Sequence, residues 1–167
     1  MIVLVDIFKE IADCMKINFE AGRGYQIVTG LVEKDNSRNY RDKKYPLLAL
    51  FMPIQENRGS GFYAQVRIPK IVIATLTIGT DPILKRYESD GTFKKILYPA
   101  YEEFLKQLAK HKNISGQDPD AFFHAKFDNP ATAPIDDANS DYVDAIEIQN
   151  LELTLINIKT CKNVSIN

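Results

Sequence analysis

Several residues that could hold a metal ion or move a proton lie in one acidic stretch, residues 113–141. There His124 lies close in sequence to Asp118, Asp120 and Asp128. Imidazole and carboxylate groups are common metal ligands, but the spacing matches neither a zinc site nor an EF-hand loop. We therefore interpret the stretch as a solvated acidic loop.

More carboxylates follow toward the last predicted strand, at Asp136, Asp137, Asp141 and Asp144. They would suit a metal-dependent enzyme that uses the acidic segment 118–144, and we keep that function as an alternative. Acidic loops that precede a strand are common without a metal. We expect no metal site, no cofactor and no catalytic residue.

Other residue types with chemical potential have simpler structural interpretations. His111 falls in the last turn of a predicted helix, where the helix dipole favours a partly cationic side chain. The glycines of 22–24 and 59–61 lack the spacing of a phosphate-binding loop and indicate turns. Cys14 and Cys161 are far apart and match no metal-ligand spacing. They predict two reduced thiols in a soluble, unexported protein.

Two segments are candidates for contact with a partner. The basic segment 38–44 interleaves Lys and Arg with a tyrosine, so it would suit a phosphate backbone, a solvated hairpin tip or a neighbouring subunit. The acidic stretch carries adjacent phenylalanines that would suit a contact surface if exposed. The predicted contact residues are Arg38, Tyr40, Arg41, Lys43, Lys44, Asp118, Asp120, Phe122, Phe123, Asp136 and Asp137.

Length, composition and charge restrict the class of protein. A chain of 167 residues that is 45% hydrophobic can build one domain with a sizeable core. The net charge of −1 gives no field that would recruit nucleic acid or an anionic membrane. No apolar run approaches the roughly 20 residues of a membrane span. We expect a single domain over residues 1–167, with a long acidic loop at about 113–141.

Hydrophobic periodicity predicts an α+β fold, because the strands cluster instead of alternating with helices. We expect a mostly antiparallel sheet of about five strands with two main helices packed on one face. The predicted helices are 5–19 and 92–112, the second interrupted at Pro99. The predicted strands are 25–33, 45–51, 62–68, 71–78 and 142–156, and the predicted loops and turns are 34–44, 55–61 and 113–141, with a helical turn at 121–125.

The last predicted strand has an irregular pattern. Ile146 and Ile148 share one parity, whereas Leu151, Leu153 and Leu155 have the other. A β-bulge at residues 149–150 would restore a single apolar face.

The order of these elements resembles a known family. The segments that carry the resemblance are the N-terminal helix, Tyr45–Leu50, Ile71–Ile78, Phe93–Tyr101 and Val143–Leu153. Together they resemble small tail-completion or tail-terminator proteins, the head-tail joining proteins of tailed bacteriophages and prophages. The resemblance implies a non-catalytic structural protein of the virion, assembled in the cytoplasm of the bacterial host.

The resemblance also implies the partners. The subunit would form a homo-oligomeric ring, a hexamer or a dodecamer, that docks to the tail tube and to portal or connector proteins. DNA would pass through the lumen, and no membrane would be involved. The family has no counterpart of the acidic stretch 113–141.

A ring fits the charge pattern, because head-to-tail contacts need two different patches on each subunit. The segments 34–44 and 113–141 have opposite charge balance, and charge reversal at Arg41 and Lys43 should block assembly. The remaining alternative is a monomeric bacterial adaptor or binding module whose 113–141 loop orders on its partner.

Overall fold

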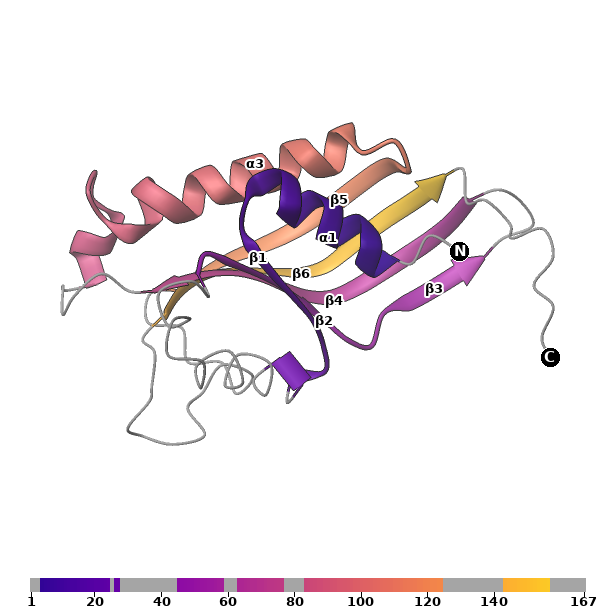
Figure 1. Cartoon of the computed structure of the whole chain (residues 1–167), viewed down its shortest axis with the longest axis horizontal. Helices are drawn as coiled ribbons and strands as arrows, with labels where there is room; N and C mark the ends of the chain where they lie inside the picture. Colours follow the sequence, from indigo (N-terminus) through magenta and orange to yellow (C-terminus); the bar gives the residue numbers. More distant parts are fainter. Residues whose placement is uncertain are drawn as a thin grey trace.

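Helices cover one face of a mixed sheet in the computed structural model (Figure 1). The structure describes residues 4–24, 26–27, 45–58, 63–76, 83–124 and 143–156. The elements, in chain order, are α1 (Leu4–Met15), β1 (Asn18–Gly22), β2 (Leu47–Phe51), β3 (Gln55–Arg58), β4 (Tyr63–Leu76), η2 (Ile83–Tyr87), η3 (Phe93–Leu97), α3 (Tyr98–Lys110), β5 (Ile114–His124) and β6 (Val143–Ile156). Among the described helices, none is long and apolar enough to cross a membrane.

Six described strands form the sheet, in the order β1-β2-β4-β6-β5, and β3 pairs with β4 beyond the end of β2. The β1–β2 pair is parallel, and every other described pair is antiparallel. The predicted α+β class, with a mostly antiparallel sheet and two helices on one face, is confirmed. The long strands β4 and β6 form the centre of the sheet, and the shorter strands flank them.

The main core lies between the sheet and the helices α1, η3 and α3. Phe8 of α1 and Phe104 of α3 are both fully buried, and their ring centroids are 5.9 Å apart. The amphipathic spacing that predicted these helices therefore marks the faces that pack on the sheet. The first helix is shorter than predicted, because it ends at Met15 and residues 18–22 form β1.

The helix interruption predicted at Pro99 is present as a change of helix type. The π-helical turn η3 precedes α3, and the Tyr98 N–H donates to the carbonyl of Phe93. Pro99 then lies in the first turn of α3, directly after this wider turn. The wider turn thus lets one continuous helical segment pass the proline.

In both central strands, the side chains that face the core change from one parity to the other at paired positions. On β4, the core side chains change from even positions up to Ile68 to odd positions from Ile71. On β6 the same change occurs between Ile148 and Leu151, where Asn150 has a φ of 51°. The β4–β6 register is unchanged across this point. Against β5, the β6 register shifts here by one residue, so the predicted β-bulge is confirmed.

Several predicted boundaries were wrong. The 62–68 and 71–78 predictions are one continuous strand over Tyr63–Leu76, because the change of parity occurs in both paired strands at once. Residues 55–58 of the predicted turn form β3, which pairs with β4. Gln26 and Ile27 are helical, not part of a strand. The rest of the predicted 25–33 strand beyond Ile27, and the 34–44 loop, lie outside the described residues.

The largest correction concerns the acidic stretch. Residues 114–124 form β5, an 11-residue strand, and residues 121–124 are extended, not helical. Its Gly, Pro and Asp residues disfavour a strand locally, but pairing with β6 supplies the missing stabilisation. Pro119 is tolerated because, in this sheet, β5 is the outermost described strand. Residues 125–142 lie outside the described part of the chain.

Candidate functional site

A groove of about 400 Å³ crosses four strands on the face of the sheet that is opposite the helices. We call it the polar groove. Its lining is formed by Gln55 and Asn57 of β3, Gln65, Val66 and Arg67 of β4, Glu152, Leu153 and Thr154 of β6, and Gly116 and Gln117 of β5. It is the candidate functional site of the described structure.

The register of the strands assembles this groove. Arg67 lies opposite both Gln55 and Glu152, in one row across three strands. A neighbouring row joins Asn57, Gln65, Thr154 and Gly116. The residues between them on β4 and β6 belong to the core, so alternation directs both rows away from the helices. Gly116 contributes backbone but no side chain to this row at β5.

The charges of the polar groove compensate each other. Arg67 donates from Nε at 2.9 Å and from Nη2 at 2.6 Å to the same oxygen, Oε1 of Glu152. The other polar side chains that face away from the helices are those of Gln55, Asn57, Gln65 and Thr154, whose amide and hydroxyl groups both donate and accept hydrogen bonds. The Gln117 side chain points the other way and donates to the carbonyl of Leu105 on α3. Such a surface can bind the polar groups of another protein without attracting a net charge.

The other end of the same sheet face is apolar and buried. Leu47, Ala49 and Phe51 of β2 and Val72 and Ala74 of β4 form a second cluster there. The Lys70 ammonium lies over the Phe51 ring, 4.4 Å from its centroid, at the border between the two halves. Among the described residues of this face, the polar groove thus occupies the half near β3.

Asp144, a predicted metal ligand of the enzyme alternative, is part of a buried ion pair. Arg86 Nη1 of η2 donates to its Oδ1 at 2.5 Å, and both side chains are at most 1% exposed. Asp144 shares the helix-covered face with Ile146, whereas Asp120 alternates with the core residue Ala121 and lies on the other face. Asp144 and Asp120 therefore cannot share one metal ion.

The described residues contain no group of three potential metal ligands. Asp118, Asp120 and His124 are all positions of β5. The other predicted ligands of this alternative lie outside the described residues: Asp128, Asp136, Asp137 and Asp141. The structure therefore does not test that part of the metal-site hypothesis.

The phenylalanines that were predicted as contact residues lie at the end of β5 and are exposed. Phe122 is 48% exposed and Phe123 is 41% exposed. Phe123 makes edge contacts with Tyr98 and Tyr101 of α3, at centroid distances of 5.4 and 6.0 Å. Burial in this cluster raises the pKa of Tyr101 above its ordinary value. The predicted contact residues of the basic segment, Arg38, Tyr40, Arg41, Lys43 and Lys44, lie outside the described residues.

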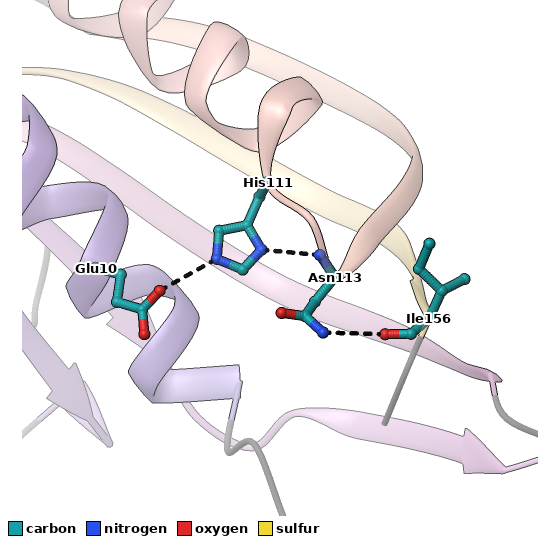
Figure 2. A network of polar contacts seen from close by, with 4 residues as sticks. All are labelled: Glu10, His111, Asn113 and Ile156. Atoms are coloured by element: carbon teal, nitrogen blue, oxygen red, sulfur yellow. Dashed lines mark hydrogen bonds and ion pairs between the residues drawn. The ribbon is translucent and has the colours of Figure 1, made fainter. Parts of the chain in front are cut away.

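His111 belongs to a polar network that joins three elements (Figure 2). Its Nε2 lies 3.4 Å from Oε2 of Glu10 on α1, and its Nδ1 accepts from the Asn113 backbone N–H at 3.3 Å. Asn113 Nδ2 donates to the carbonyl of Ile156 at the end of β6, at 3.2 Å. His111 thus connects α1, the α3–β5 turn and β6.

The sequence did not single out the polar groove, although it carried a signal for it. That signal is the alternation within the predicted strand 62–68, where Gln65 and Arg67 lie between the apolar residues Ala64, Val66 and Ile68. The alternation does not predict the pairing register, which aligns the groove residues of β3, β5 and β6 with those of β4. No protein-family model matches this chain, and no curated protein matches it significantly.

Proposed function

We propose that this protein is a structural virion subunit of a tailed bacteriophage or prophage, placed at the head-tail junction or at the end of the tail. It acts as a tail-terminator, tail-completion or connector subunit by ring assembly and docking, not by catalysis. It is assembled in the host cytoplasm, and DNA passes through the lumen of the ring. The order of elements that resembles this family supports the proposal.

The observation that carries the proposal is the one-sided covering of the sheet. Helices cover one face, and the other face presents the polar groove over four strands. A rigid sheet is a suitable base for docking, because its side chains are held in fixed rows. The groove is the surface that we assign to the tail tube or portal protein.

The composition of the groove favours docking over proton transfer. Its only charged side chains, Arg67 and Glu152, bind each other. Docking through amide and hydroxyl groups is reversible and needs no reactive group, as expected for a subunit that must find its position on a growing particle.

The test is to image the purified protein by negative-stain electron microscopy over a concentration series. We expect closed rings of uniform size that become more frequent with concentration. Replacing Gln65 by Arg adds an uncompensated charge to the groove; this variant should still form rings, because the groove is assigned to a different partner. Folded protein that remains in single subunits at the highest concentration would overturn the proposal and favour the monomeric adaptor.

A further inference from the structure

Three side-chain amides of the polar groove can bind another molecule. They belong to Gln55 and Asn57 of β3 and to Gln65 of β4, and all three residues are exposed. No hydrogen bond joins these side chains to another residue in the part of the chain that the structure describes. A side-chain amide both donates and accepts a hydrogen bond, as a peptide group does. These amides can therefore pair with the main chain of a partner protein.

The charges of the groove favour a partner segment without charge. Arg67 and Glu152 already bind each other, with 2.6 Å between Nη2 and Oε1. A lysine or an aspartate of the partner would lose bound water here and would find both opposite charges occupied. An uncharged polar segment avoids this cost and still finds partners for its hydrogen bonds.

An exposed aromatic ring lies beside the amides. Tyr63 is two residues before Gln65 on β4, so both side chains lie on the face opposite the helices. Tyr63 is 48% exposed, and the half-buried Ile156 of β6 lies opposite it. A tyrosine ring can bind an apolar side chain of a partner while its hydroxyl stays in water. The face thus combines hydrogen-bonding groups with one apolar anchor.

The groove is wide enough for a short extended segment. Four strands at a spacing of about 4.8 Å span about 14 Å, which about four extended residues cover. On the β5 side, a Cβ atom on Gly116 would meet only Thr154 Oγ1, at 4.0 Å. Backbone without a side chain is therefore accessible to a second main chain at this position.

We infer that the polar groove binds the main chain of an extended, uncharged segment of about four residues in the docking partner. The three amides bind the peptide groups of that segment, and one of its apolar side chains contacts Tyr63. This inference rests on the proposed function, because it specifies the part of the tail or portal protein that the groove recognises. Because no net charge takes part, binding should depend little on salt concentration.

The probe is a pool of blocked tetrapeptides composed of Ser, Thr, Asn, Gly and Tyr, which we call the neutral pool. It is titrated into the isotope-labelled protein while NMR records the side-chain amide signals. We expect the signals of Gln55, Asn57 and Gln65 to shift, with half-saturation at about 1 mM peptide. Pools with Lys or Asp at one position should bind about tenfold more weakly, as should the neutral pool with N-methylated peptide bonds, which lack donors.

Substitutions in the groove test the same assignment from the side of the protein. Gln65→Leu removes an amide, Tyr63→Ser removes the ring, and Gly116→Leu covers the accessible backbone. Each should weaken binding of the neutral pool by about fivefold or more. The matched control is Gln107→Leu, which removes an amide from α3 on the other side of the sheet and should leave binding unchanged.

Circular dichroism and thermal melting select the variants that fold like the unaltered chain. Equal binding of the neutral and charged pools would overturn this inference, as would folded groove variants that bind the neutral pool as tightly as the unaltered chain. It would also be overturned if the three amide signals did not shift. Each of these results leaves the proposed function standing, since ring formation is measured separately. A chain that binds the neutral pool but never forms rings would overturn the proposed function and leave the peptide preference of the groove.

Discussion

Strand β6 carries two carboxylates that pair with arginines, and the two pairs lie in opposite environments. Asp144 binds Arg86 at 2.5 Å, with both side chains buried below the helices. Glu152 binds Arg67 at 2.6 Å on the open face, with both side chains more than half exposed. The N–O distances of the two pairs are nearly the same. Burial is therefore the difference that should decide how much each pair contributes to stability.

The irregularity at Asn150 places the two carboxylates of β6 on opposite faces of the sheet. Asp144 and Glu152 are eight residues apart, so in a regular strand they would share one face. The change of parity at residues 149–150 places one below the helices and the other in the polar groove. One strand thus carries a buried ion pair on one face and lines the polar groove on the other.

The largest expected effect comes from breaking the buried pair. Asp144→Ala leaves the Arg86 guanidinium buried without this carboxylate and should lower the free energy of unfolding by about 3–5 kcal/mol. Urea denaturation measures it. The matched double variant Arg86→Met with Asp144→Leu should recover most of the loss; a single variant within about 0.5 kcal/mol of the unaltered chain would contradict the account.

The position of Arg86 depends on a close backbone approach at Gly91. A Cβ atom there would lie 2.3 Å from the carbonyl oxygen of Arg86, which is backbone and cannot move aside cheaply. Gly91→Ala should therefore destabilise the protein by about 1–3 kcal/mol, measured in the same denaturation experiment. Gly116→Ala is the control, since its Cβ would meet only Thr154 Oγ1, at 4.0 Å.

The parity change can be tested at Asn150 itself. Its φ of 51° is tolerated by asparagine and glycine but is strained for a β-branched residue. Asn150→Val should cost about 1–2 kcal/mol, whereas Asn150→Gly should stay within about 0.5 kcal/mol. Equal melting temperatures for the two variants would mean that the change of parity on β6 does not depend on the positive φ of Asn150.

The exposed pair should have a small effect on stability. Glu152→Gln removes a charge that water already screens, so the free energy of unfolding should fall by less than about 1 kcal/mol, and less at high salt. If Glu152→Gln lowered the free energy of unfolding as much as Asp144→Ala, burial would not explain the difference between the two ion pairs.

The smallest effect concerns alkaline pH near the buried pair. Burial, with nearby Tyr98 and Asp144, raises the pKa of Tyr87 above its ordinary value of 10.0. The unfolded chain therefore loses this proton first, and the stability due to Tyr87 is present below pH 10 and lost as the pH rises through the folded pKa. Tyr87→Phe should flatten the alkaline fall of the unfolding free energy, and an unchanged slope would refute this cause.

Much of the fold could be predicted because its signals are local. The apolar spacing of both helices, the interruption at Pro99 and the parity change at residues 149–150 all follow from neighbouring residues. The same locality explains the errors. The strand Tyr63–Leu76 was predicted as two strands because the matching change of parity lies on β6. Strand β5 was missed because its stabilisation comes from a distant partner strand.

The site was less predictable than the fold. Phe122 and Phe123 were predicted as contact residues on the condition that they are exposed, and both are more than one-third exposed. The polar groove draws its residues from four strands whose register is set only by tertiary pairing. The Arg86–Asp144 pair likewise joins residues 58 positions apart, and nothing near either residue marks it.

The central claim is that this chain works by assembling with copies of itself. The most direct test is the solution mass by light scattering after size exclusion, over a concentration series and at two salt strengths. The account predicts one discrete species at a fixed multiple of 19.0 kDa, with its proportion rising with concentration and falling at high salt. A mass of one subunit at every concentration and salt strength would contradict it.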